Sequence, residues 1–313
     1  MYVIKNGLPK RMLPLAYFFA LAGMIGCLPA FQSNQLIQIT GDLAFSEIKN
    51  FNILGGLVLA GITGLVVIGG LKRIAEVATF LVPLMGSIYF GAMLIALTLN
   101  LDQVFPAFKL ILVDAFNGTA IAGGTFFGVL IYGVRRGAFS NEAGMGTESL
   151  VHGVAKVSDP VKQGLVAMTG PIFDTLIICT ATALMILISG VWETSTSQGV
   201  TLTAEAFSML LGNFGGFILF ICVICFGLST IFTYSYYGAS CSRFLFGKFG
   251  MKFYIYLYIF SIFIYSIVPI DIAINIADGA FAMMAIPTLV SALWLAPKVM
   301  QASKNYFKLI DSY

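Results

Sequence analysis

The sequence predicts an all-α protein that crosses a membrane several times, and three observations lead to this fold class. Hydrophobic residues make up 59% of the 313 residues and charged residues only 10%, whereas soluble domains average roughly 45–50% and about 25%. Apolar runs of about 20 residues, the length a helix needs to cross the hydrocarbon core, recur along the chain. Lysine and arginine concentrate in every second connection between these runs.

Eight apolar units are expected to cross the membrane within a single transmembrane domain, residues 1–313, and the fourth unit is interrupted. The first unit follows three basic residues, as a signal peptide would, but its apolar run is too long and carries no small-residue cleavage site. We therefore expect a retained helix there. The expected spans lie near residues 12–31, 52–70, 77–99, 119–155, 164–191, 214–240, 253–270 and 277–297.

The basic residues predict the orientation of these spans. Cytoplasmic connections are enriched in lysine and arginine near the span ends. With a cytoplasmic N-terminus, only Lys49 and Lys109 fall in outer connections, whereas Arg135 and Arg136 lie inside a span. The inner connections then hold Lys5, Lys10, Arg11, Lys72, Arg73, Lys156, Lys162, Arg243, Lys248, Lys252, Lys298, Lys304 and Lys308. We expect a multi-pass protein of the cell (inner) membrane with an even number of spans and a cytoplasmic N-terminus.

Other classes of protein fit the sequence poorly. The net charge of +3 is small and scattered, so a nucleic-acid partner is not expected. Cys222 and Cys225 form a C-x-x-C pair inside an apolar run, without the second ligand pair or βαβ pattern that redox or zinc chemistry would need. The spans contain no nucleophile with a base and no metal-ligand group, so we expect neither an enzyme nor a cofactor.

The stretch GVRRGAFSNEAGMGTESLVHG, residues 133–153, interrupts the fourth apolar unit. Gly144 and Gly146 follow Ser140 and Asn141 closely. Glycine costs about 1 kcal/mol relative to alanine in a helix, and Ser and Asn side chains compete for backbone hydrogen bonds. The helix is therefore expected to unwind here. Unwound backbone at membrane depth requires protein or a water-filled cavity to supply its hydrogen bonds, so the break predicts a polar site.

Such a break places two half-helices end to end near the bilayer midplane. The upstream end exposes carbonyl groups, which suit an ammonium group or Na⁺, and the downstream end exposes N–H groups, which suit a carboxylate. This combination matches a zwitterionic amino acid with a coupling cation. Discontinuous helices of this kind are typical of transporter binding sites.

Two acidic residues lie in mid-span, where an ionisable group is functional by default. Glu142 is either part of the site architecture, including an ion pair with Arg135 or Arg136, or a direct ligand. Asp174 either pairs with an arginine of the broken helix or takes part in ion or proton coupling.

Two further pairs have a simple local interpretation. Glu148 and His152 lie four residues apart and favour a local pair at the cytoplasmic mouth. Ser229 and Thr230 are adjacent hydroxyls deep in the sixth span, where back-bonding to the carbonyl four residues earlier is the ordinary interpretation.

Several segments resemble the alanine or glycine:cation symporter family, also called sodium:alanine symporters. The strongest resemblance lies in GVRRGAFSNEAGMG, which is similar to the family signature around its broken helix. The other segments are GLVAMTGPIFDTLIICTATALMILISGVW, GGLKRIAEV, FQSNQ, FGLSTIFTYSYYG and ADGAFAMMAIPTL. Together they cover almost the whole chain in the order of the family.

The resemblance implies the leucine-transporter fold, with ten core helices in two inverted repeats of five. It also implies roles for individual residues. Ser140, Asn141 and Gly144 would frame the amino acid, Gln32 and Asn34 would line the pocket, and Ser229 and Thr230 would offer hydroxyls to Na⁺. From their position in the spans, and not from the resemblance, Arg136, Glu142 and Asp174 are expected to serve coupling or site architecture. The sequence departs from the family pattern at Arg135, at Tyr234, where tryptophan is common, and at 147–149. The last two departures leave the preferred substrate open.

Only three spans precede the broken helix, whereas the five-plus-five core needs five, and MYVIKNGL resembles an internal segment of the family. We therefore expect a C-terminal portion truncated to eight transmembrane helices, with the two absent core helices as possible partners. The expected function is sodium-coupled symport of alanine or glycine by alternating access, compromised in this chain. The alternatives are a non-transporting remnant or split half, and a proton-coupled carrier or channel in which Glu142 or Asp174 handles H⁺.

Overall fold

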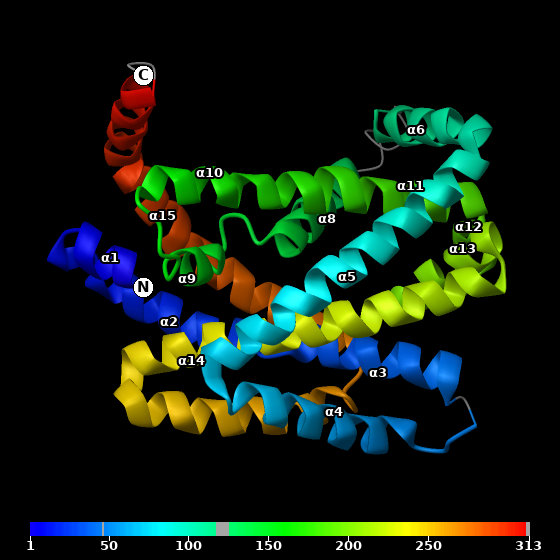
Figure 1. Ribbon diagram of the computed structural model, residues 1–313, viewed down its shortest axis with the longest axis horizontal. Helices are drawn as coiled ribbons and strands as arrows, with labels where there is room; N and C mark the ends of the chain where they lie inside the picture. Colours follow the sequence, from blue (N-terminus) through cyan, green and yellow to red (C-terminus); the bar gives the residue numbers. More distant parts are fainter. Residues whose placement is uncertain (46, 117–124, 311–313) are drawn as a thin grey trace.

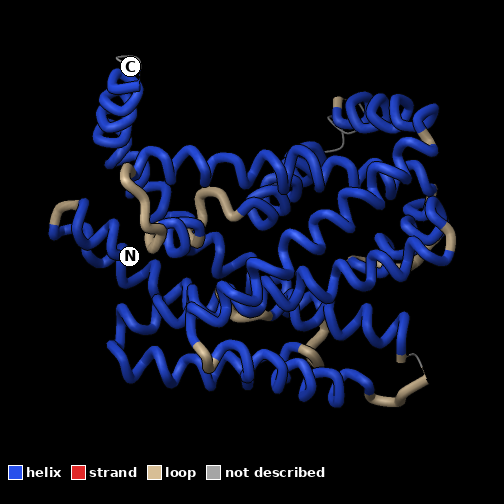
Figure 2. The backbone as a smooth tube through the Cα atoms, viewed as in Figure 1, coloured by secondary structure: helices blue, strands red, loops and turns tan. Residues whose placement is uncertain are grey.

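The computed structural model describes residues 1–45, 47–116 and 125–310, and all regular elements in these ranges are helices (Figures 1 and 2). The expectation of an all-α protein is therefore confirmed for the described residues. The longer helices are α2 (Leu13–Gly26), α3 (Ala30–Ala44), α4 (Phe51–Val67), α5 (Gly70–Leu99), α6 (Leu101–Ala115), α8 (Thr125–Asn141), α10 (Pro160–Pro171), α11 (Thr180–Ser189), α13 (Val200–Leu211), α14 (Asn213–Tyr265) and α15 (Ile270–Ile310). The shorter ones are α1 (Tyr2–Gly7), η1 (Lys10–Met12), α9 (Glu148–His152), the π-helix η2 (Ile172–Cys179) and α12 (Val191–Thr194).

Several of these helical runs are suited to a membrane. Among the described residues, five runs are long and apolar enough to cross it, namely Lys10–Ala44, Gly70–Leu99, Pro160–Ser189, Phe214–Tyr265 and Ile270–Ile310. The fourth run covers two expected spans, because α14 folds back at Gly247, whose φ of 69° interrupts the helical backbone. Its two arms run side by side in Figure 1. The chain is a multi-pass membrane protein.

The first run extends further than the sequence predicted. Helix α2 ends at Gly26, and after a short break that contains Pro29 the helix resumes as α3, so the expected span 12–31 is only its first half. Proline breaks the ladder because it has no N–H to donate. The glutamines of α3 lower the hydropathy of this helix. The side-chain amide of Gln35 donates to Gln38 at 2.8 Å, and its oxygen accepts from the Val200 amide at 3.1 Å. These polar groups are therefore paired inside the helix bundle.

Helices α2 and α3 pack along the first arm of α14 in antiparallel register, and glycine permits the close contact. A Cβ atom on Gly23 would lie 2.7 Å from the sulfur of Cys241, and one on Gly227 would lie 2.7 Å from Leu36. Small residues at such interfaces allow helix backbones to approach closely in membranes.

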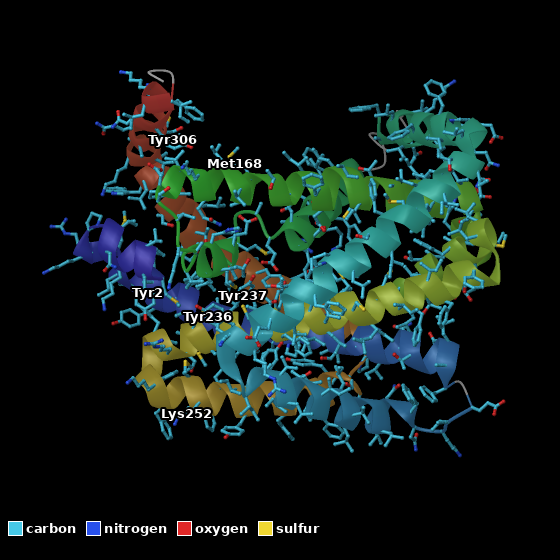
Figure 3. The ribbon with its side chains drawn as sticks, in the orientation of Figure 1. Tyr2, Met168, Tyr236, Tyr237, Lys252 and Tyr306 are labelled. Carbon is cyan, nitrogen blue, oxygen red and sulfur yellow. The ribbon has the colours of Figure 1, made fainter. Side chains whose placement is uncertain are left out.

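The two arms of α14 are joined by buried tyrosines. A Cβ atom on Gly238 would lie 2.0 Å from the hydroxyl oxygen of Tyr254, so only glycine fits there. The fully buried Tyr254 donates to the Met24 carbonyl at 2.8 Å, and Tyr258 donates to the Ile231 carbonyl at 2.6 Å. Figure 3 labels Tyr236 and Tyr237 on the first arm, where it meets α2. This core holds α14 in place as a wall of the candidate site.

Candidate functional site

The site is built around the interruption between α8 and α9. Helix α8 ends at Asn141 and α9 begins at Glu148. Between them Glu142, Gly144 and Gly146 adopt positive φ angles of 54°, 80° and 85°. Glycine tolerates this conformation, but a glutamate in it is uncommon and is held there by its surroundings.

Neighbouring side chains satisfy part of the unwound backbone. The Ala143 amide donates to the side-chain oxygen of Asn141 at 2.9 Å, and the Ser149 hydroxyl donates to the Gly146 carbonyl at 2.7 Å. From α15, the Thr288 hydroxyl lies 3.3 Å from the Met145 carbonyl. Protein groups thus supply hydrogen bonds to backbone at membrane depth, as an unwound segment requires.

The downstream half-helix is shorter than predicted. Helix α9 has 5 residues and ends at His152, where the sequence predicted helix to Ala155. Gly153 follows, and residues 153–159 form turns and coil. One helical turn carries little macrodipole, so N–H groups for a carboxylate would have to come from the break itself. The expected start of the upstream half, 119–124, lies outside the described residues.

Ser140, in the last turn of α8, contacts the π-helix η2. Its hydroxyl donates to Oδ2 of Asp174 at 2.5 Å and lies 3.2 Å from the sulfur of Cys179. Thr175 also donates to Oδ2 of Asp174, at 3.4 Å. Asp174 therefore does not pair with an arginine of the broken helix, which was one of the two expectations for it.

Glu142 is paired with a residue of α14. The hydroxyl of Tyr234, which is 4% exposed, donates to Oε1 of Glu142 at 2.7 Å. The expected ion pair of Glu142 with Arg135 or Arg136 is not formed, because Arg135 is exposed and Arg136 pairs with another helix. The bond ties the unwound segment to the first arm of α14.

Arg136 forms an ion pair with Asp278 of α15. The guanidinium also lies 5.5 Å from the ring centroids of Tyr132 and Phe139, within the range of a cation–π interaction. This pair links α8 to α15 one helical turn before the break.

Aromatic rings from four helices surround the break. Phe139 of α8 makes edge contacts with Phe31 of α3 and Phe281 of α15, both at 5.4 Å between ring centroids. Tyr234 of α14 meets Phe281 edge-on at 6.5 Å. The polar groups of the break are thus bordered by large rings.

Gln32 and Asn34 lie on α3, beside this aromatic layer. Gln32 is half-buried. The amide of Asn34 donates to the Val268 carbonyl at 2.7 Å and lies 3.4 Å from the Tyr265 carbonyl, so it satisfies the C-terminal end of α14. Asn34 also borders a hollow of about 310 Å³ between α3 and residues 266–270. The side chain of Asn34 therefore contacts the α14–α15 connection, and its contacts do not include the break.

Ser229 and Thr230 lie one to two turns before Tyr234 on the first arm of α14. Both hydroxyls donate to the Phe226 carbonyl, at 2.9 and 3.0 Å. The structure thus contains the back-bonding that is ordinary for such residues. A hydroxyl that donates its hydrogen keeps its oxygen lone pairs, so the geometry leaves both oxygens able to accept a cation.

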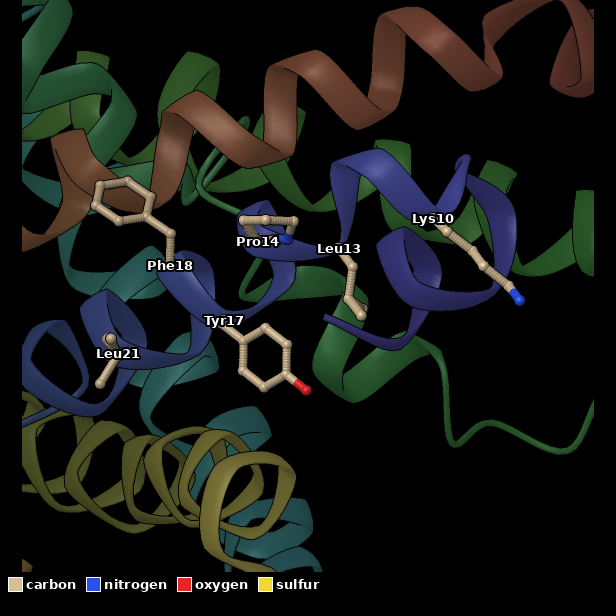
Figure 4. Close-up of a pocket in the computed structure, with 6 residues that line it drawn as sticks. All are labelled: Lys10, Leu13, Pro14, Tyr17, Phe18 and Leu21. Carbon is tan, nitrogen blue, oxygen red and sulfur yellow. The ribbon is translucent and has the colours of Figure 1, made fainter.

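His152 forms a hydrogen bond with Gln163 of α10, with 2.6 Å between Nδ1 of the His152 ring and Nε2 of Gln163. The expected local pair of His152 with Glu148 is not formed. The described residues contain no group of three His, Cys, Asp or Glu side chains that could hold a metal ion. The hollow of about 570 Å³ in Figure 4 lies along the apolar face of α2, with Lys10 at its edge, and offers no comparable set of polar groups.

Two residues of this site were not singled out from the sequence. Asp278 lies in the ADGAF segment, and an acidic residue in an apolar run is itself a signal of function. Tyr234 stands where tryptophan is common in the family, which by itself indicates no partner. No local pattern could have indicated that Tyr234 meets Glu142, because the two residues lie 92 positions apart in the chain.

A multi-pass helical membrane protein with a broken helix that gathers polar groups belongs to the class of transporters. Comparison with known proteins agrees with this class. The chain belongs to the sodium:alanine symporter family, which it matches over residues 1–312. The family consists of sodium-coupled symporters, so the chain is a member of a transporter family and not of an enzyme family, and Na⁺ is the coupling ion of its family.

The chain aligns with several known proteins over nearly its whole length. It is 35% identical to an uncharacterized transporter of Bacillus subtilis, YflA, over 98% of this chain and 66% of that protein. It is 34% identical to the sodium/alanine symporter AgcS of Methanococcus maripaludis, over 98% of this chain and 68% of that protein. A probable sodium/glutamine symporter of Bacillus subtilis, GlnT, is 32% identical over 97% of this chain and 63% of its own length. The chain thus spans about two thirds of the length of these relatives.

Proposed function

We propose that this chain carries the substrate and sodium sites of a symporter for a small neutral amino acid, alanine or glycine. The observation that carries the proposal is the break between α8 and α9, where Ser140 contacts Asp174 of the π-helix and Glu142 contacts Tyr234 of α14. We propose that Ser140, Asn141 and Gly144 of this segment frame the amino acid. Exposed backbone groups at a break provide complementary partners for the ammonium and carboxylate of one amino acid.

The aromatic layer supports a small substrate. Phe31, Phe139, Phe281 and Tyr234 border the break, and rings of this size would exclude a large side chain and favour a substrate whose side chain is a methyl group or a hydrogen. Relatives of similar identity are named for alanine and for glutamine, so overall identity does not assign the substrate. Gln32 would border the same pocket from α3.

For sodium, we propose the hydroxyl oxygens of Ser229 and Thr230. Hard cations take oxygen ligands, and both hydroxyls direct their hydrogens to the Phe226 carbonyl. The amino acid and Na⁺ would then move together by alternating access, each raising the affinity for the other. The leucine-transporter fold and a location in the cell membrane belong to the same proposal and rest on the family resemblance. A cytoplasmic N-terminus belongs to it too, supported by the distribution of basic residues.

Binding in detergent provides a test that does not require complete transport. We expect sodium to tighten binding of radiolabelled alanine to the purified chain, with competition by unlabelled glycine and none by glutamine. Ser229→Ala combined with Thr230→Ala should remove the dependence on sodium. Thr233→Ala is the matched control, because its hydroxyl also back-bonds on the same arm, to the Ser229 carbonyl at 2.9 Å. Sodium dependence that survives in the double variant would refute the assignment.

A second candidate is a proton-coupled carrier, favoured by the carboxylates of Glu142 and Asp174 in the spans. In proteoliposomes, alanine uptake driven by a pH gradient without sodium would support it. Uptake that requires an inward sodium gradient and ignores the pH gradient would support the sodium symporter.

A further inference from the structure

The last part of α15 is the starting point of the inference. Helix α15 contains 41 residues, about twice the roughly 20 that are needed to cross a bilayer. Pro297 lies inside it, and proline kinks a helix because it removes a hydrogen bond of the ladder. Figure 1 shows the part that follows, the 298–310 segment, in red and turned away from the bundle.

The direction of the 298–310 segment places it along the membrane surface. Helices α10 and α11 and both arms of α14 belong to membrane runs and extend across the view of Figure 1, so the membrane normal lies along them. The segment is transverse to these helices. It lies at the end of the bundle that carries α1, because Gly7 packs against Leu295: a Cβ atom on Gly7 would lie 3.3 Å from a methyl group of Leu295.

The two faces of the segment differ in polarity. At the 3.6-residue period of a helix, one face carries the polar side chains of Lys298, Gln301, Lys304, Asn305 and Lys308. Four apolar side chains on the opposite side are between 45% and 64% exposed, namely Val299, Met300, Phe307 and Ile310. An amphipathic helix with lysines on its polar face is typical of segments that lie in a membrane interface.

Positive charge gathers at this end of the bundle. Lys298, Lys304 and Lys308 form no ion pair with another described residue. Helix α1 contacts the first arm of α14 here, with Nζ of Lys5 5.8 Å from the ring centroid of Phe244. Further exposed basic residues of these elements are Lys10, Arg11, Arg243 and Lys248. Such a surface is complementary to the negative surface potential of a membrane that contains anionic lipids.

We propose that the 298–310 segment lies flat in the membrane surface and binds the headgroups of anionic phospholipids. Its apolar face enters the boundary between headgroups and acyl chains, while Lys298, Lys304 and Lys308 meet the lipid phosphates. The cytoplasmic side follows from the proposed orientation. The lipid contact itself involves neither sodium nor the amino acid, so its test is independent of the proposed function.

The two tryptophans of the chain are matched reporters of nearby lipid. Trp294 precedes the segment by one turn, and Trp192 lies in α12 at the other end of the bundle; their side chains are 52% and 46% exposed. We incorporate single chains into phosphatidylcholine nanodiscs that contain a trace of lipid with a dansyl group on one acyl chain. In Trp192→Phe, energy transfer from Trp294 to labelled phosphatidylglycerol should exceed transfer to labelled phosphatidylcholine several-fold.

Salt and the second tryptophan provide the controls. The preference should disappear at about 1 M NaCl, where the Debye length falls to roughly 3 Å. Trp294→Phe, which leaves Trp192 as the reporter, should show no preference. Equal transfer from Trp294 to the two lipids would overturn the proposal, and so would the same preference at Trp192.

Charge removal tests the lysines. Each lysine near an anionic surface strengthens binding about fivefold, so Lys298→Gln, Lys304→Gln and Lys308→Gln together should abolish the preference at Trp294. Lys49→Gln with Lys109→Gln removes charge from the connections at the other end and should leave the preference intact. A preference that survives the triple variant would refute the assignment of the lysines.

Hydrogen exchange followed by mass spectrometry tests the apolar face. The amides of the segment should exchange several-fold more slowly in phosphatidylglycerol nanodiscs than in phosphatidylcholine nanodiscs. Val299→Ser with Phe307→Ser should remove this difference, whereas Phe249→Ser, at an exposed phenylalanine beside the turn of α14, should keep it. All variants should retain the elution volume of the unmodified chain. If exchange is equal in the two lipids and slows only when two chains share a nanodisc, the segment is a contact between copies and the lipid proposal is overturned.

Discussion

At the scale of single residues, the site depends on polar side chains that find each other inside the membrane. Glu142 adopts an uncommon backbone conformation and accepts a hydrogen bond from Tyr234, and Ser140 donates to Asp174. The first bond joins the unwound segment to α14, and the second joins α8 to the π-helix. Polar groups without such partners are expensive in a medium that lacks water.

Removal of the Tyr234 hydroxyl tests the first of these bonds. In Tyr234→Phe, Glu142 loses its donor, and an unsatisfied buried group costs about 1–3 kcal/mol. We expect a lower unfolding temperature of the detergent-solubilised chain and weaker alanine binding. Tyr237→Phe is the matched control, because this neighbour on the same arm is also buried. The role of the bond would be contradicted if both variants shifted the unfolding temperature equally.

At the scale of elements, the break between α8 and α9 results from the local sequence, and neighbouring helices pack closely against it. Gly146 combines a φ of 85° with close packing, since a Cβ atom there would lie 2.6 Å from the Thr288 hydroxyl and 2.7 Å from Phe19. The break is thus a defined piece of structure on which α2 and α15 pack.

Alanine substitutions at two glycines of this segment should have opposite effects. Gly146→Ala introduces a clash and a strained backbone angle, so we expect marked destabilisation and loss of alanine binding. Gly137→Ala lies in α8, where an added Cβ meets no atom within 4 Å, and removal of a helical glycine stabilises by up to about 1 kcal/mol. Thermal unfolding followed by circular dichroism compares the two. Equal destabilisation would show that the break is not specifically packed.

At the scale of the whole molecule, two groups of helices meet at the site. The first arm of α14 packs along α2 and α3, while α8 contacts the π-helix and α15. The ion pair between Arg136 and Asp278 joins α8 to α15 within the second group, and the ring contact between Phe31 of α3 and Phe139 of α8 connects the two groups. The site is therefore a product of helix packing and not of one segment.

The Arg136–Asp278 pair should contribute to this assembly. The Arg136 and Asp278 side chains are 30% and 20% exposed. We therefore expect Arg136→Gln or Asp278→Asn alone to lower the free energy of unfolding by about 1–3 kcal/mol, less than the roughly 3–5 kcal/mol lost when a fully buried ion pair is broken. Arg135→Gln, at the exposed neighbour, should change little. A double-mutant cycle measured by thermal unfolding gives the coupling energy. Additive effects of the two substitutions would exclude a direct interaction.

Much of the architecture could be predicted from the sequence because it depends on neighbouring residues. The apolar runs predicted an all-helical membrane protein, and the SNEAGMG segment predicted the position at which α8 ends. Predictions about helix ends were less accurate. The first span continues past Pro29 because the polar side chains of α3 find partners inside the protein. Helix α9 ends at His152, three residues before the predicted end.

By itself, the sequence determined that this is a multi-pass helical protein, where its helix breaks, and that it belongs with the sodium:alanine symporters. Only the tertiary structure decided the partners: Arg136 with Asp278, Glu142 with Tyr234, and Ser140 with Asp174. The physical reason is that helix formation and breakage depend on consecutive residues. The partner of a buried polar group depends instead on which helices pack side by side, and that is set by contacts between residues far apart in the chain.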